Sequence, residues 1–280
     1  MPFPVPTNLS PSRVEAFTSC PLAFRFASIE KLPEPPVAHL TKGSLVHRAL
    51  ELLFCRHPDD RSLEGGLQAL AAAVAEYRTD DEFVGLELDG DAEAGFLADA
   101  EELMRRYFTM EDPQRVREIG IELYLEARVG RLTLRGIIDR LELDDDGELV
   151  VTDYKTGRPP SIHREQQRLG GVHFYAYLCQ QVFGRRPARI QLLYLSTGEI
   201  IVARPSEQSI QFLPRRTAAV WQAVERACEA GDFRPRVGPL CDHCGFKPWC
   251  PAWGGDPDRA AFEAPVHYGR GAVQLPLTMA

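Results

Sequence analysis

Three side chains with the chemistry needed to cleave a phosphodiester bond lie close together in the sequence: Asp139, Asp153 and Lys155. Hard cations such as Mg²⁺ and Mn²⁺ prefer oxygen ligands, and they commonly bind through one or two carboxylates together with a substrate phosphate. A bound cation lowers the pKa of a coordinated water and neutralises charge on the phosphate. The lysine ammonium is a compact point charge that can orient a nucleophile or stabilise the transition state.

A β-hairpin is the element that must bring these side chains together. Residues 132–154 contain two β-rich runs around the cluster Asp-Asp-Asp-Gly, a turn signal because Gly supplies positive φ and Asp tolerates it. Side chains alternate across a strand, so Asp153 and Lys155 project from one face and Tyr154 from the other. Asp139 lies in the paired strand, so two carboxylates and an ammonium can meet at one point. The main-chain carbonyl of Tyr154 can add another oxygen.

A surface hairpin with an ion pair across its strands is the alternative interpretation, because an Asp-x-Lys triplet also arises by chance at ordinary composition. The context favours a site. The strand Gly136-Ile-Ile-Asp139 leads into the turn, and apolar residues immediately precede the acid in Val150-Val-Thr-Asp153-Tyr-Lys155.

At these residues the chain resembles the PD-(D/E)XK nuclease superfamily, in particular the RecB-like exonucleases, which include the AddB nuclease domain and the CRISPR-associated RecB-like iron-sulfur nucleases. The resemblance implies an α/β fold with a restriction-endonuclease-like core, in which helices flank a mixed central sheet. It also implies that Asp139, Asp153 and the carbonyl of Tyr154 bind Mg²⁺ or Mn²⁺ and that Lys155 assists catalysis.

A histidine upstream is a further candidate ligand. Residues 43–56 read as a helix in which His47 shares a face with Leu50 and Phe54. On this pattern alone, a histidine packed in the core is the alternative. The resemblance favours a metal ligand, because Gly43-Ser-Leu-Val-His47 is similar to the family's helical histidine that joins the two acids.

Three cysteines near the C-terminus have the spacing of metal ligands, Cys241-x₂-Cys244-x₅-Cys250, in a segment rich in Gly and Pro. Three ligands need a fourth. Cys20 is the candidate because its Cys-Pro setting resembles the N-terminal cysteine of the AddB-like nucleases, in which the four thiolates hold a 4Fe-4S cluster. Zinc bound by the same four cysteines, or with His243 in place of one, and free thiols are the alternatives.

The remaining cysteines, Cys55, Cys179 and Cys228, fall within predicted helices and are expected to be small buried hydrophobes. Seven cysteines without a secretion signal argue against a disulfide framework.

The helix predicted over 165–183 carries candidate substrate-binding residues. RecB-like nucleases usually have a Gln-x-x-x-Tyr element here, and Tyr175 matches its tyrosine. The position four before it is Gly171 rather than Gln, so the family pattern is broken. Gln166, Gln167 or His173 of the same helix could substitute, and the sequence does not decide which; Gln167 stands beside Tyr175 as a candidate substrate-binding residue.

The other predicted elements surround this core. Helices are expected over 11–17, 22–27, 67–77, 92–108 and 206–230, and strands over 116–129, 188–195 and 199–204. The acid-rich connection 80–91 is expected to be a solvated loop. On the strand 116–129, Glu122 points opposite to the apolar residues, toward either the metal site or solvent. We expect a single nuclease domain over 1–280, with a helical insertion at 57–112 and a cluster-bearing lobe formed by 10–28 and 231–256.

Composition limits the partners. The net charge of −8 argues against a protein that coats nucleic acid over its whole surface, so contacts with DNA must be local. Residues 80–102 hold ten carboxylates and no Lys or Arg, whereas many arginines follow the hairpin. A membrane-spanning run and a signal peptide are both missing from the sequence, which predicts a cytoplasmic protein.

Together these features predict a metal-dependent DNA exonuclease acting at DNA ends or on single-stranded DNA, in repair or recombination. A phosphate-binding helicase motif is missing, so any unwinding would come from a partner such as a helicase or another repair protein. A catalytically weak DNA-binding or helicase-partner module, favoured by Gly171, and a zinc-stapled structural protein are the alternatives.

Overall fold

The computed structural model describes residues 2–159 and 162–268, and over 162–170 its description is confined to the helical backbone. The chain divides into two compact units. One comprises Met1–Pro35, Val129–Thr133 and Arg215–Ala280, and the other comprises Pro36–Arg128 and Leu134–Pro214. Residues 10–28 and 231–256 both fall in the first unit, whereas 57–112 falls in the second.

A five-stranded mixed sheet forms the centre of the second unit, as predicted. Its strands lie in the order β1 (Arg117–Val129), β2 (Leu132–Leu143), β3 (Leu149–Lys155), β4 (Arg189–Tyr194) and β5 (Glu199–Ala203). β2 and β3 are antiparallel, β3 and β4 parallel, and β4 and β5 antiparallel. A parallel pair requires a crossover, which α7 (Ile162–Phe183) provides.

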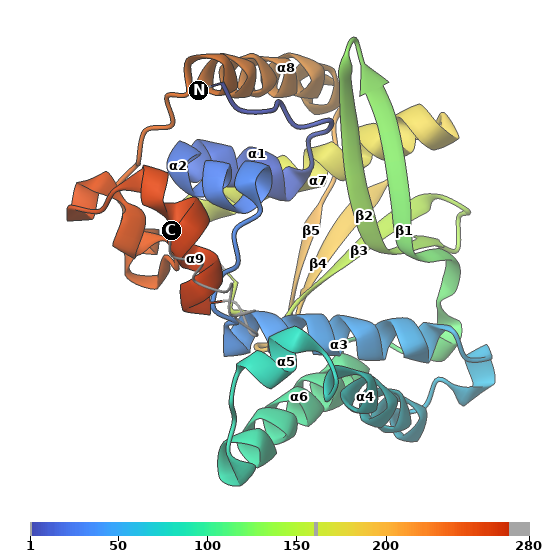
Figure 1. Ribbon diagram of the computed structural model, residues 1–280. Coiled ribbons are helices and arrows are strands. Elements are labelled where there is room, and N and C mark those ends of the chain that lie inside the picture. The colour runs from blue at the N-terminus through green and yellow to red at the C-terminus, as the bar shows by residue number, and fades with distance from the viewer. Residues whose placement is uncertain (1, 160–161, 269–280) are drawn as a thin grey trace. The chain divides into compact units, whose positions relative to one another are not determined.

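Four helices pack together beside the sheet (Figure 1): α3 (Ala38–Phe54), α4 (Leu63–Tyr77), α5 (Asp81–Gly85) and α6 (Gly90–Met110). Ser62 caps the N-terminus of α4 and Asp89 caps that of α6, each through a side-chain oxygen that accepts a backbone N–H. Their buried faces form one core with Tyr154 of β3 and Leu193 of β4. This core fixes α3 against the strands.

The structure corrects two expectations in this unit. The predicted loop 80–91 contains the helix α5, which Asp80 caps and in which Phe83 is buried, so a hydrophobic anchor holds part of the acid-rich segment. Cys55 is not a buried helical residue, because α3 ends at Phe54 and Cys55 is exposed. Cys179 and Cys228 are buried, as expected.

The first unit joins the two ends of the chain. Helices α1 (Pro11–Ser19) and α2 (Pro21–Phe24) come from the N-terminal end, and α9 (Ala260–Tyr268) and the part of α8 (Glu207–Ala230) from Arg215 onward come from the C-terminal end. Apolar residues from both ends of the chain pack into one core, which includes Leu22, Phe24, Val224, Phe246 and Trp249.

Ser10 caps α1, as its Ser-Pro signal predicts. The α-helix predicted over 22–27 is wrong in its second half. The chain passes from α2 into a π-helical segment, Arg25–Glu30, in which Phe26 is buried and Arg25 pairs with Glu30. In the part of the chain that the structure describes, every helix is too short or too polar to cross a membrane.

Candidate active site

The hairpin of β2 and β3 brings together the acids that the sequence singled out. The backbone N–H of Tyr154 donates a hydrogen bond of 2.7 Å to Oδ2 of Asp139. On β3, the ammonium of Lys155 forms an ion pair with Oδ2 of Asp153, and Asp153 is buried. The two carboxylates and the lysine therefore lie near one another at one end of the hairpin. Lys155 pairs with an acid of its own strand, so it does not form the cross-strand ion pair of the alternative interpretation.

His47 of α3 reaches the same point. Its Nε2 lies 3.0 Å from the carbonyl oxygen of Tyr154, and its Nδ1 lies 3.6 Å from Oδ2 of Asp139. An imidazole that donates Nε2–H to a carbonyl presents Nδ1 as a free ligand nitrogen, the usual arrangement around metal-binding histidines. The contacts of His47 are thus polar ones at the hairpin, and they differ from those of a histidine enclosed in the core.

Glu122 of β1 joins His47 and Asp139 in a close group of possible ligand atoms, whereas Asp153, which the sequence also predicted as a ligand, is not part of this group. One ligand atom from each of His47, Glu122 and Asp139 lies within 4.8 Å of the others, a grouping found among the described residues. The sequence left open whether Glu122 faces the site or solvent. Two signals were available, its position as an acid within an apolar strand and the acid that the resembling family often has on this strand, and the structure places Glu122 at the site.

Burial and charge crowding shape the protonation of this cluster. Burial, and then the nearby Asp153, raise the pKa of Asp139 well above its usual value. Burial also raises the pKa of Glu122, with further contributions from Glu51 and Asp153, whereas it lowers the pKa of His47.

Lys155 shows the opposite balance. Burial alone would lower its pKa, but Asp153 and Asp139 hold the pKa above its usual value, so the lysine stays charged. Oxygen-rich ligands with one imidazole, crowded enough to repel one another, are the donor set that a hard divalent cation accepts. The residues present therefore fit Mg²⁺ or Mn²⁺.

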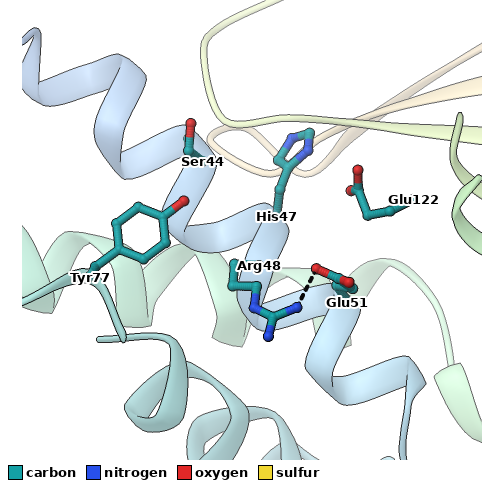
Figure 2. Close-up of a pocket in the computed structure, with 7 residues that line it drawn as sticks. Ser44, His47, Arg48, Glu51, Tyr77 and Glu122 are labelled. Carbon is teal, nitrogen blue, oxygen red and sulfur yellow. Dashed lines mark hydrogen bonds and ion pairs between the residues drawn. The ribbon is translucent and has the colours of Figure 1, made fainter. Parts of the chain in front are cut away.

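A cavity of about 440 Å³ opens beside His47 (Figure 2). Ser44, His47, Arg48 and Glu51 project from α3 around it, with Gly43, Tyr77 and Glu122 completing the lining. The guanidinium of Arg48 pairs with Glu51 and with Glu76, at 2.7 Å in each case. The positive charge of Arg48 in this cavity is therefore neutralised by two glutamates.

Tyr175 of α7 lies near the carboxylates. It is half-buried, and burial followed by the charges of Asp153 and Asp139 raises its pKa. Gly136 of β2 allows this approach, because a Cβ there would come 3.0 Å from Cε1 of Tyr175. The side chains of Gln166 and Gln167 lie outside the described residues. A Cβ added at Gly171 would meet no atom of the described residues within 4 Å.

The cysteines of the two chain ends meet in the first unit. Cys20, Cys244 and Cys250 all pack against its core. Burial raises the pKa of the Cys244 thiol, and the neighbouring Cys20 and Cys241 contribute to the rise. The N–H of Arg236 donates to Sγ of Cys20 at 3.5 Å.

A second N–H···S contact serves Cys241, whose Sγ accepts from the N–H of Gly238 at 3.4 Å. Backbone donors aimed at sulfurs suit thiolate ligands of a metal centre. His243 is exposed, which disfavours it as a replacement for one of the sulfurs.

Comparison with known proteins agrees with this geometry. The model of the PD-(D/E)XK nuclease superfamily matches residues 8–251. The Gene 69 protein of Mycobacterium phage D29 is 27% identical over 268 residues, covering 87% of this chain and 96% of the phage protein. A crystal structure described as "Putative exonuclease" from Eubacterium rectale has the same fold, with a TM-score of 0.52, 14% identity, and 85% and 87% of the two chains covered. Because the family match spans most of the chain, including the hairpin, the protein belongs to the PD-(D/E)XK nuclease superfamily.

Proposed function

We propose that this protein is a Mg²⁺- or Mn²⁺-dependent DNA exonuclease that hydrolyses phosphodiester bonds at DNA ends or on single-stranded DNA, in DNA repair or recombination. One observation carries the proposal. The Asp153–Lys155 ion pair lies beside His47 and Asp139 in a chain of a nuclease superfamily. A protein that only bound DNA would have no use for this combination of a buried acid, a half-buried acid and a half-buried lysine.

In this proposal Asp139, Asp153, His47 and the carbonyl of Tyr154 would hold the cation. When bound, the divalent ion acts as a Lewis acid that activates water and neutralises phosphate charge. The hydrogen bond from Tyr154 N–H to Asp139 orients that carboxylate.

Lys155 acts on the reacting phosphate. Its pairing with Asp153 keeps the ammonium charged and fixes it next to the acid, so little reorganisation is needed when negative charge develops on the phosphate. Tyr175, near the same acids, contacts the nucleotide beside the scissile bond. Gln167 is a second candidate for substrate contact on α7.

The test uses purified protein with end-labelled single-stranded and duplex DNA, with Mg²⁺, Mn²⁺ or chelator. We expect degradation to require the cation, and Asp153→Ala and Lys155→Ala to lower the rate by about 10³-fold, since each removes a group of the reacting centre. Glu126→Gln, an exposed glutamate of β1, is the matched control. Undiminished cleavage by either variant contradicts the assignment.

A second function, a DNA-binding or helicase-partner module that cuts poorly, is favoured by Gly171, where the family usually has Gln. The same assay separates the two. If the wild-type protein binds labelled DNA in the presence of Ca²⁺ yet degrades it no faster than Lys155→Ala does with Mn²⁺, the module is the correct function.

We also propose that Cys20, Cys241, Cys244 and Cys250 hold a 4Fe-4S cluster. The cluster would link the two ends of the chain and stabilise the fold by closing the long loop between them. The packing of Cys20 beside Cys244 and the N–H donors to Cys20 and Cys241 support this. Anaerobic purification should give about four irons and four sulfides per chain.

The cluster proposal has a matched pair of variants. Cys20→Ser should lose most of the iron, whereas Cys55→Ser, which changes an exposed cysteine, should keep all of it. One zinc and no iron per chain would show that these cysteines bind zinc instead of a cluster. Equal iron in both variants would remove Cys20 from the ligand set.

A further inference from the structure

The cavity beside His47 has the size of a small-molecule site. Its volume of about 440 Å³ falls within the range of about 300–1,000 Å³ that ligand pockets have in proteins. Gly43 and Ser44 of α3 belong to its lining, and they leave room that longer side chains at these positions would fill. The space is therefore large enough to admit a group of a substrate.

This cavity adjoins the candidate active site. His47 and Glu122 line the cavity, and together with Asp139 they form the close group of possible ligand atoms. A phosphodiester that reacts at this group carries a nucleoside on each side, so each nucleoside needs space next to the group. The cavity offers such a space, because it shares two of its residues with the group.

The charges around the cavity disfavour a phosphate inside it. Among the described residues that line it, Arg48 is the one with a fixed positive charge, and its guanidinium is already paired with Glu51 and Glu76. Glu51 and Glu122 belong to the lining as well. Burial lowers the pKa of His47, so the imidazole adds no positive charge at neutral pH. An uncharged group therefore enters this cavity at a lower cost than a phosphate does.

Tyr77 gives the cavity an aromatic wall. It is the last residue of α4, and its ring extends toward α3 near Ser44 (Figure 2). The side chain also packs against the helical core, which holds the ring in place. Burial, followed by the charges of Asp80 and Glu82, raises the pKa of the phenol, so the ring stays neutral. A fixed aromatic ring is a surface on which a nucleobase can stack.

We propose that this cavity binds the base and sugar of one nucleotide next to the scissile phosphate, with the base stacked on Tyr77. This role of the cavity rests on the proposed nuclease function and defines which part of the DNA the cavity recognises. Every base has an aromatic face, so Tyr77 should accept all four bases. Stacking on a side chain requires an unpaired base, which favours single-stranded DNA over duplex DNA.

The test uses end-labelled single-stranded DNA that contains one abasic nucleotide, digested with Mn²⁺ and separated as a ladder of products. In the wild-type protein, one phosphodiester bond next to the abasic nucleotide should be cleaved about tenfold more slowly than the other bonds, because it has no base to stack. In Tyr77→Ala, all bonds should be cleaved about tenfold more slowly, and the delay at the abasic nucleotide should disappear. The delay is a ratio within one digest, so it does not depend on the amount of active protein.

Three further variants check that stacking causes the delay. Tyr77→Phe keeps the ring and should keep the delay. Tyr124→Ala removes an exposed tyrosine of β1 that does not line the cavity, and it should keep the delay as well. Ser44→Leu changes an exposed residue of α3 and fills part of the cavity, so it should remove the delay even if Tyr77→Ala does not fold.

The outcomes separate the two proposals. A wild-type protein that degrades no DNA with Mn²⁺ overturns the nuclease function, and the role of the cavity with it. Degradation without a delay at the abasic nucleotide, or a delay that Tyr77→Ala and Ser44→Leu leave unchanged, overturns the role of the cavity alone. A rate that depends on a terminal phosphate in the wild type but not in Ser44→Leu would make the cavity a phosphate site, which also overturns its role as a nucleoside site.

Discussion

The guanidinium of Arg140 donates a hydrogen bond of 2.7 Å to the phenolic oxygen of Tyr154. Arg140 is fully buried, and it also pairs with Glu111 at the end of α6 and with Glu142 of its own strand. The residue next to Asp139 thus ties the hairpin to the helical core through the side chain of Tyr154. The same Tyr154 offers its N–H to Asp139 and its carbonyl to His47.

Replacing Arg140 should therefore unfold the protein more easily. Arg140→Met leaves the carboxylates of Glu111 and Glu142 without their buried cation, and breaking a buried pair in this way costs about 3–5 kcal/mol. Urea denaturation at pH 7 measures the loss. Arg135 lies on the same strand as Arg140 and forms a more exposed pair with Glu126 of β1. Arg135→Met should therefore cost less than about 1 kcal/mol. Similar losses for both variants would contradict the importance of the buried network.

Glu118 should make stability depend on acid pH. Burial alone would raise its pKa, but hydrogen bonds from the buried Arg61 hold the pKa below the ordinary value of 4.5. Because the folded pKa is lower than the unfolded one, this stabilisation is complete above about pH 4.5 and disappears as the pH falls through the folded pKa. Glu118→Gln should lose less stability than the wild type between pH 6 and pH 3, as urea titrations at each pH would show. Parallel pH profiles would remove Glu118 from the acid response.

Most of the fold followed from patterns in the sequence. A β-rich run and a mostly apolar run predicted β2 and β4 to within one residue at each end, and the Asp-rich turn predicted the hairpin between β2 and β3. These patterns succeed because strand faces are sorted by burial. The helix α5 and the π-helical segment were missed, because each depends on a tertiary contact, that of Phe83 or that of Arg25 with Glu30.

The site was predictable only in part. Asp139, Asp153 and Lys155 were found from local alternation, and His47 from its resemblance to the family's helical histidine. Glu122 could not be placed, because regular alternation predicts the direction of a side chain only while φ stays in the β region, and here φ is +46°. Long-range packing decides that conformation.

Gly136 should be required for the approach of α7. A Cβ at this position would lie 2.8 Å from Cδ1 of Leu178 and 3.0 Å from Cε1 of Tyr175, so Gly136→Ala must displace the helix. Such overpacking costs about 1–3 kcal/mol, and it should lower nuclease activity further by moving Tyr175. Urea denaturation and initial rates on single-stranded DNA measure the two effects. Gly157→Ala, where a Cβ meets open space, is the control for stability. A Gly136→Ala protein that keeps its stability and its rate would contradict the close packing.

Gly171 offers a test of substrate contact from α7. A Cβ there would meet no atom of the described residues within 4 Å, and Gly inside a helix is less stable than Ala by about 1 kcal/mol. Gly171→Ala and Gly171→Gln should therefore both stabilise the protein, by about 0.5–1 kcal/mol. Only Gly171→Gln restores an amide one helical turn before Tyr175, so only it should lower KM for single-stranded DNA. The two variants share the gain in helix stability, so a lower KM in both would mean that helix stability, and not the amide, causes the change. An unchanged KM in Gly171→Gln would show that this position does not reach the substrate.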